Sequence, residues 1–202
     1  MNIYKPTQEY QMKPLNEMNL VHDPNQLHFF REIRELTPKD AIIVEIGSYV
    51  GAIANQFIGD NRKVFSIDPW QSEGVYDTND EFGQYALIDD ANKNRGGINN
   101  IYKTWMSNAG KDLFVNIFPI KGFSYDIAEF FHLPIDLLYI DGCHKYESVI
   151  NDIKIWSPKV KSGGIIMGDD YGGHFTGVAK AVHESFDTVK VLMGNQWIYK
   201  KP

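Results

Sequence analysis

Three carboxylates in the second half of the chain could bind a cation together. Asp141 follows the apolar run 135–140, and Asp169 and Asp170 follow the apolar run 163–167. Ligands of open α/β sheets bind at the carboxyl ends of the strands. Three carboxylates converging there would repel one another unless a hard cation neutralised them. The sequence therefore predicts a divalent-cation site, with magnesium as the first choice and calcium or manganese as alternatives.

A histidine, His144, lies three residues after Asp141. An imidazole with its ordinary pKa of about 6.5 can take up a proton near neutral pH. Structural roles are also open for these side chains. His144 could cap the helix expected to begin near Tyr146, and the carboxylates could be solvated turn residues, with Asp169 or Asp170 capping a helix.

Residues 41–51 predict a second kind of site. They form an apolar strand that breaks into two glycines, Gly47 and Gly51. Gly47 would let a ligand approach the main chain, and Gly51 would let the next helix pack against the strand. Asp68 ends the following apolar run, where a carboxylate can accept hydrogen bonds from both hydroxyls of a ribose. The pattern indicates a nucleoside-cofactor site, although an ordinary strand-to-helix turn and a turn aspartate before Pro69 are the alternatives.

The elements that must position these residues alternate along the chain. Short apolar runs are separated by helical patterns, which is typical of a mostly parallel sheet with helices on both faces. Strands are expected at 41–46, 63–67, 114–120, 135–140, 163–167 and within 188–199. Helices are expected near 26–36, 51–58, 124–131, 145–156 and 176–186.

The length of 202 residues predicts one α/β domain over 26–202. Residues 1–25 would be an N-terminal cap or tail. The polar segment 71–112 predicts a lid-like insertion, with a crossover helix preceded by a loop as the alternative. Its aromatic residues suit stacking on a sugar face or an aromatic ring, and exposed ones would be consistent with a homodimer contact; they include Tyr76, Tyr85 and Trp105.

Composition disfavours several classes of partner. The net charge is -6, and the longest basic cluster is Lys200–Lys201, so we expect no nucleic-acid partner. No apolar stretch approaches the roughly 20 residues that span a bilayer, so no membrane role is expected. The single cysteine, Cys143, excludes an internal disulfide, and together with a polar N-terminus it favours a cytoplasmic location.

Several motifs together resemble a known family. Glu45-Ile46-Gly47-Ser48-Tyr49-Val50-Gly51 resembles the first motif of class I S-adenosylmethionine-dependent methyltransferases. Its Glu-x-Gly-x-Tyr-x-Gly form is similar to that of catechol-type, metal-dependent O-methyltransferases and their bacterial sugar and natural-product relatives. Further segments fall in step with the family: Gly122-Phe123-Ser124-Tyr125-Asp126-Ile127, Ile140-Asp141-Gly142-Cys143-His144, the run from Gly163 to Asp170, and, weakly, Met18-Asn19-Leu20.

The resemblance implies a fold, a cofactor and roles for residues. The fold would be Rossmann-like and doubly wound, with a seven-stranded, mostly parallel sheet and a reversed C-terminal hairpin. The cofactor would be S-adenosyl-L-methionine, bound by Glu45, Gly47, Ser48, Tyr49, Gly51, Asp68, Ser124, Tyr125 and Asp141. A divalent cation would be bound by Asp141, Asp169 and Asp170.

The chain departs from the catechol-type pattern at two positions. His144 stands where those enzymes carry a lysine base, and it resembles the Asp-Gly-x-His variant of the bacterial relatives. We therefore expect His144 to be the general base, with Lys145 as the fallback. Asp170 stands where the family often carries Asn, which leaves the metal preference open.

The leading hypothesis is an S-adenosylmethionine-dependent O-methyltransferase that acts on a hydroxyl of a small molecule or sugar, with help from a divalent cation. The alternatives are a metal-independent methyltransferase and a non-catalytic cofactor-binding module of the same fold. A nicotinamide dehydrogenase is disfavoured. Its fingerprint is Gly-x-Gly-x-x-Gly, whereas Gly47 is followed by Ser48 and Tyr49.

Overall fold

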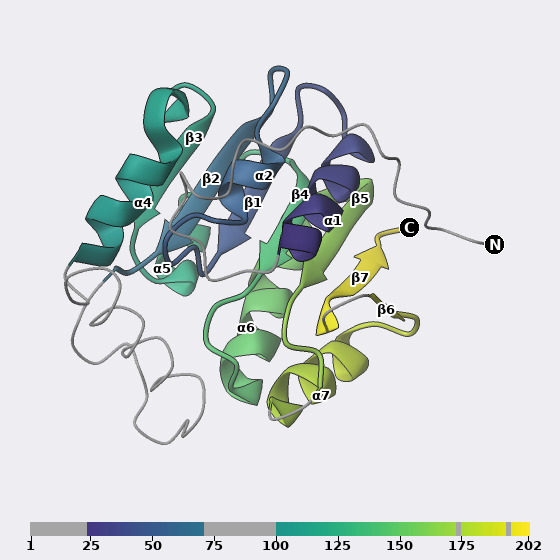
Figure 1. Ribbon diagram of the computed structural model, residues 1–202. Helices are drawn as coiled ribbons and strands as arrows, with labels where there is room; N and C mark the ends of the chain where they lie inside the picture. The colour runs from purple at the N-terminus through teal and green to yellow at the C-terminus, as the bar shows by residue number, and fades with distance from the viewer. Residues whose placement is uncertain (1–23, 71–99, 173–174, 193–194) are drawn as a thin grey trace.

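A seven-stranded sheet organises the computed structural model, which describes residues 24–70, 100–172, 175–192 and 195–202. The strands are β1 (Ile42–Ile46), β2 (Lys63–Asp68), β3 (Ile117–Lys121), β4 (Ile135–Ile140), β5 (Val160–Gly168), β6 (Lys190–Val191) and β7 (Trp197–Lys200). Their order in the sheet is β3-β2-β1-β4-β5-β7-β6 (Figure 1). β1 to β5 are parallel, and β7 is antiparallel to both β5 and β6. The predicted Rossmann-like sheet with a reversed C-terminal hairpin is confirmed.

Helices cover both faces of the sheet (Figure 1). One face packs against α1 (Pro24–Glu35), α2 (Ala54–Phe57) and α4 (Ile101–Ala109), and the other against α5 (Ser124–Ala128), α6 (Tyr146–Trp156) and α7 (Thr176–Ser185). Successive strand residues point to opposite faces, so Ile43 is buried in the first layer and Val44 in the second. No helix in the described ranges has the length and apolar character needed to cross a bilayer.

Element boundaries differ from the predictions where glycines and turns intervene. β5 begins at Val160 rather than at residue 163, and Gly163 and Gly164 within it pair with Lys201 through backbone hydrogen bonds of 2.9 Å each. β3 begins only at Ile117, because Phe114 has a positive φ of 56° and belongs to the preceding turn. Both shifts concern the beginnings of strands, and the predicted site residues lie at or after the carboxyl ends of strands.

The described part of the segment 71–112 contains a helix followed by a short turn. Residues 101–109 form the helix α4, and its Trp105 is fully buried in the core. Trp105 is therefore not available to stack on a substrate. Residues 71–99, with Tyr76 and Tyr85, lie outside the described residues, as do residues 1–23 with the cap motif Met18–Leu20. Lid and cap remain predictions there.

Candidate active site

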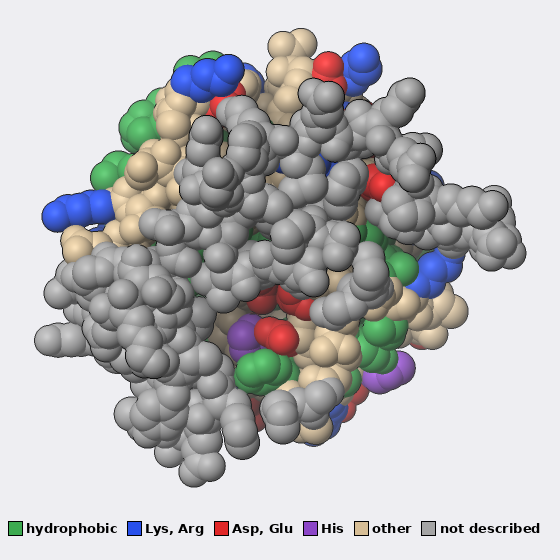
Figure 2. Space-filling view, viewed as in Figure 1, with side chains coloured by type: hydrophobic (Ala, Val, Ile, Leu, Met, Phe, Trp, Pro, Cys, Tyr) green, Lys and Arg blue, Asp and Glu red, His purple; other side chains and the backbone are tan. Residues whose placement is uncertain are grey.

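The predicted site residues meet at the carboxyl edge of the sheet, in two groups. The loop half comprises Gly47, Ser48 and Tyr49 after β1 and Asp68 at the end of β2. The acidic half comprises Asp141 and His144 after β4 and Asp169 and Asp170 after β5. Figure 2 shows acidic side chains and a histidine gathered near the middle of this face, beside hydrophobic side chains.

Gly47 joins the two halves by close backbone contact. Its φ is +81°, and a Cβ atom there would lie 2.1 Å from the backbone oxygen of Asp141. A side chain at this position would be strained by its φ and would also overlap main-chain atoms that cannot easily move. The loop therefore passes directly against the end of β4, as a site shared between β1 and β4 requires.

The other side of the loop is fixed by Trp105 from α4. Its indole Nε1 donates a hydrogen bond of 2.7 Å to Ser48 Oγ. A Cβ atom at Gly51 would lie 2.7 Å from the same Nε1 atom. The buried indole thus packs on the loop half, where it orients the Ser48 hydroxyl.

The carboxylate of Asp68 faces the loop rather than solvent. Oδ2 accepts hydrogen bonds from the backbone N–H groups of Ser48 (3.0 Å) and Tyr49 (2.9 Å), and Oδ1 accepts one from Trp70 N (2.7 Å). Burial raises the pKa of Asp68, and these three donors offset only part of that rise. Each carboxylate oxygen can accept about two hydrogen bonds. One ribose hydroxyl can therefore bind Oδ1 with the loop unchanged, whereas a second would displace an N–H donor.

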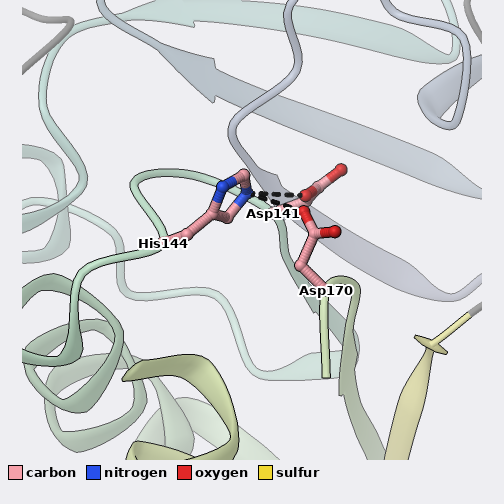
Figure 3. A group of neighbouring side chains, drawn as sticks. All are labelled: Asp141, His144 and Asp170. Carbon is pink, nitrogen blue, oxygen red and sulfur yellow. Dashed lines mark ion pairs between the residues drawn. The ribbon is translucent and has the colours of Figure 1, made fainter. Parts of the chain in front are cut away.

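The acidic half holds two carboxylates and an imidazole within metal-binding distance. In Figure 3 the side chains of Asp141 and Asp170 point toward the His144 ring. His144 Nε2 lies 3.5 Å from Asp141 Oδ1 and 3.0 Å from Asp170 Oδ2, and one potential ligand atom from each residue lies within 4.8 Å of the others. The Nε2 atom is buried, and neither contact has hydrogen-bond geometry. A nitrogen and two carboxylate oxygens so arranged fit a shared cation.

The charges of this group determine the protonation of His144. Burial lowers the pKa of His144, but the nearby carboxylates of Asp141 and Asp170 outweigh this effect and raise the pKa to about 10. Without a cation, the imidazole is therefore protonated at neutral pH and offsets part of the charge of the two carboxylates. A base must be unprotonated, so His144 can accept a proton only when another positive charge takes its place.

Asp169 is oriented differently from its neighbour. Both of its oxygens accept hydrogen bonds of 3.0 Å from Gln196 Nε2, and Oδ1 also accepts one of 2.8 Å from Asp170 N. Burial, followed by the charge of Asp141, raises the pKa of Asp169 to about 7. The structure thus brings Asp141 and Asp170 together with His144, and it pairs Asp169 with Gln196. Cation binding by Asp169 remains a prediction.

A buried polar layer lies under both halves. Neither carboxylate oxygen of Glu45 has a hydrogen-bond partner of good geometry among the described residues. Burial raises the pKa of Glu45 to about 7, although the hydroxyls of Ser48 and Ser66 act in the opposite direction. Tyr139, also fully buried, donates a hydrogen bond of 3.3 Å to Asp141 Oδ2. Glu45 therefore gains or loses its proton near neutral pH.

The remaining predicted residues lie at the rim. Tyr125 is exposed, and its ring stacks on Phe123 with centroids 5.3 Å apart. Ser124 begins α5 and donates a hydrogen bond to Asp152 Oδ1. Lys145 is the N-cap residue of α6, which leaves His144 just outside that helix.

Sequence reasoning missed three polar contacts of the site. Asp152 could have been found, because it is an acid among Val149, Ile153 and Trp156 on the apolar face of a predicted helix. The contacts of Gln196 with Asp169 and of Trp105 with Ser48 carry no sequence signal, since each joins elements far apart in the chain.

A groove of about 680 Å³ lies elsewhere, toward the C-terminal end of α6. It is lined by Ile153, Phe186, Tyr199 and Lys201, among others. The ammonium group of Lys201 is already bound by the backbone oxygens of Ser157 and Val160. The groove lacks the convergent carboxylates of the sheet edge, so the chemistry is assigned to that edge.

Residues 44–171 match the family described as "Methyltransferase domain". The chain belongs to this family. The match begins within β1 and ends just past Asp170, so it includes both the loop half and the acidic half of this methyltransferase domain.

The chain is similar to one known protein over a short stretch of sequence and to several solved structures in fold. An uncharacterized protein of Acanthamoeba polyphaga mimivirus is 46% identical over 61 residues, which is 28% of this chain and only 28% of that protein. A proposed caffeoyl-CoA O-methyltransferase from Staphylococcus aureus has a TM-score of 0.62 at 17% identity, covering 93% of this chain and 88% of its own. The O-methyltransferase NovP has a TM-score of 0.61 at 20% identity, with 87% and 79% covered. These structures establish a common fold.

Proposed function

We propose that this methyltransferase domain transfers the methyl group of S-adenosyl-L-methionine to a hydroxyl of a small molecule or sugar, assisted by a divalent cation. The observation that carries the proposal is the contact of the two halves at Gly47. A glycine loop clamped by a half-buried aspartate lies directly against a group of two carboxylates and an imidazole. Such an edge can hold a nucleoside cofactor and a hydroxyl side by side, and this positioning is a large part of the catalysis.

The loop half would bind the cofactor. Asp68 Oδ1 has capacity for a ribose hydroxyl, and the backbone of Gly47 leaves room for the amino-acid part of the cofactor. Ser124, at the start of α5, lies on the side where the adenine would rest. The sulfonium is cationic, so the carboxylates of the acidic half and Glu45 favour its binding electrostatically.

Asp141, His144 and Asp170 would hold the cation, with Asp169 close by. When bound, the cation would stabilise the oxyanion that develops on the acceptor hydroxyl. Two carboxylates suit Mg²⁺, whereas an imidazole nitrogen as third ligand favours Mn²⁺ or another transition metal. The Nε2 atom of His144 has no hydrogen-bond partner among the described residues, and this feature makes the mixed set fit.

His144 Nε2 is also the predicted acceptor of the hydroxyl proton. The same nitrogen cannot bind the cation and the proton at once. If the carboxylates alone hold the cation, the added positive charge lowers the pKa of His144 from about 10, and the neutral ring can act as the base. If His144 is a ligand, Lys145 is the remaining candidate. A His144→Ala variant separates the roles, because loss of cation affinity marks a ligand and loss of turnover alone marks a base.

The proposal is tested by transfer of a radiolabelled methyl group from S-adenosyl-L-methionine to a library of sugars, phenols and other hydroxyl compounds. We expect transfer to one class of acceptor with Mg²⁺ or Mn²⁺, and its loss in EDTA. The variant Glu147→Gln, on the exposed side of α6, is the matched control and should retain full activity. Absence of transfer to every hydroxyl acceptor, with transfer to an amine acceptor instead, would contradict O-methylation.

One observation favours a metal-independent methyltransferase as the second candidate. A protonated His144 already offsets part of the negative charge of Asp141 and Asp170, so the acidic half can exist without a cation. In that case EDTA would leave turnover unchanged. Turnover would then fall as the pH rises through about 10, where the imidazolium is lost.

A further inference from the structure

We propose that Asp152, acting through Ser124, makes the adenine end of the cofactor site select a 6-amino purine over a 6-oxo purine. The inference deepens the proposed function and rests on it. It assigns Asp152 as a positioning residue, with Ser124 as the group that touches the base.

The two residues come from adjacent helices on one face of the sheet. Asp152 lies on α6 and is 5% exposed. Its Oδ1 atom accepts a hydrogen bond from the hydroxyl of Ser124, the first residue of α5. Its Oδ2 atom faces the loop after β4, where a Cβ atom on Gly142 would lie 4.0 Å from it. The pair therefore sits between the ends of β3 and β4, beside the proposed adenine position.

Packing alone does not explain a carboxylate at this position. Its neighbours on the buried face of α6 are Val149, Ile153 and Trp156. Burial raises the pKa of Asp152 to about 6, and the Ser124 hydroxyl lowers it only in part. A buried charge with a single hydrogen bond is less favourable than an apolar side chain of similar size. The carboxylate has one evident effect on its surroundings, which is to orient the Ser124 hydroxyl.

That orientation determines which purine the site can accept. A serine hydroxyl has one hydrogen to donate and two lone pairs that accept. Because the hydrogen is directed to Asp152, Ser124 Oγ can only accept a hydrogen bond from a ligand. The 6-amino group of adenine is a donor and satisfies it. The 6-oxo group of hypoxanthine is an acceptor, so it would face the Oγ lone pairs without a hydrogen between them.

The test compares the dissociation constants of S-adenosylhomocysteine and S-inosylhomocysteine by calorimetry at pH 7.5. The wild-type protein should prefer the adenosyl compound by roughly 30-fold, within the range expected when a site built for a hydrogen bond meets the wrong partner. In Asp152→Asn the amide can donate to Ser124 Oγ and free the hydroxyl hydrogen for the 6-oxo group. We expect the preference to fall to about threefold or less.

A second variant and a matched control complete the experiment. Ser124→Ala should weaken the adenosyl compound about tenfold and leave the inosyl compound nearly unchanged. Glu147→Gln, the same carboxylate-to-amide change on the exposed side of α6, should keep the wild-type ratio. A purely structural role for Asp152 would weaken both compounds together and preserve the ratio.

The outcomes separate this inference from the proposed function. If the wild-type protein binds both compounds equally, or if Ser124→Ala keeps the full preference, the inference is wrong and cofactor binding stands. If the wild-type protein binds neither compound, the proposed function itself is wrong. Circular dichroism confirms that each variant is folded, and Ser124→Ala still decides the matter if Asp152→Asn does not fold.

Discussion

The loop half and the acidic half share one edge of the sheet, but their charges are balanced by different means. In the loop half, three backbone N–H groups donate hydrogen bonds to the half-buried carboxylate of Asp68. In the acidic half, two carboxylates contact one imidazole. Its Nε2 atom has no hydrogen bond of good geometry among the described residues. Backbone donors keep their place whatever the pH, whereas a balance among side chains depends on protonation and on bound ions.

The difference suggests which half is complete without its ligand. The loop half is preorganised by main-chain contacts, so it should bind the nucleoside part of the cofactor in the absence of metal. The acidic half is held by a proton that a cation can replace, so its geometry and its pKa values should change when a cation binds. Variants of the loop half should therefore weaken cofactor binding alone, and variants of the acidic half should weaken cation binding alone.

The largest effect is expected where the halves meet, in Gly47→Ala. A positive φ costs a non-glycine residue about 1–2 kcal/mol, and overlap with the Asp141 backbone adds to it. We expect the free energy of unfolding, measured with urea, to fall by at least about 3 kcal/mol. Gly163→Ala is the control, since Gly163 has a similar φ of +77° but no atom within 4 Å of the added Cβ, and it should lose only about 1 kcal/mol. Equal losses in both variants would show that the close approach is unimportant.

The next effect is expected in Asp68→Asn, which breaks the loop half alone. The amide nitrogen cannot accept from the loop N–H groups, so the loop loses a charged acceptor at the cofactor position. The dissociation constant of S-adenosylhomocysteine should rise roughly 100-fold in calorimetry. Mn²⁺ affinity should stay within about twofold of the wild type. Asp126→Asn, an exposed change in the first turn of α5, should alter neither quantity, and a similar loss there would point to a general charge effect.

A smaller change concerns Glu45, beneath the two halves. Its pKa is about 7 in the folded protein against 4.5 when exposed, so the folded state favours the protonated form. The stability that this provides is present below pH 4.5 and is lost as the pH rises through about 7. In the wild type the free energy of unfolding should therefore fall between about pH 5 and pH 8. In Glu45→Gln this fall should be smaller by on the order of 2 kcal/mol. An unchanged pH profile from urea titrations would mean that Glu45 does not titrate in this range.

The smallest expected effect is that of Asp170→Asn on the acidic half. An amide oxygen can still bind a cation but lacks the charge, so Mn²⁺ affinity should fall roughly tenfold, measured by the electron paramagnetic resonance signal of free Mn²⁺. Binding of S-adenosylhomocysteine in EDTA should stay within about twofold. This is the reverse of the Asp68→Asn pattern. If both variants weakened both ligands equally, the two halves would have to be treated as one site.

The sequence predicted the fold well, because it depends on local patterns, whereas the cofactor role of the loop half remains a prediction. Apolar runs matched the strands, and β4 begins at Ile135 and ends at Ile140 as expected. Gly47 and Asp68 were found because a glycine at a tight turn and an acid at a strand end follow from backbone geometry. The family match over residues 44–171 agrees with this part of the prediction.

The acidic half was predicted less completely, because side-chain partners from distant elements decide it. Asp169 and Asp170 are adjacent in the sequence, yet one pairs with Gln196 and the other with His144. The positive φ of Asp170, 59°, turns consecutive side chains in different directions, and no composition or spacing rule indicates this. Likewise, Trp105 was expected at a substrate surface, but α4 places it in the core beside Ser48.

The most direct test of the account is a calorimetric titration of the metal-free protein with S-adenosylhomocysteine in EDTA at neutral pH. We expect one-to-one binding in the micromolar range, because the loop half is complete without a cation. Absence of binding up to about 1 mM, both in EDTA and after addition of Mn²⁺, would contradict it.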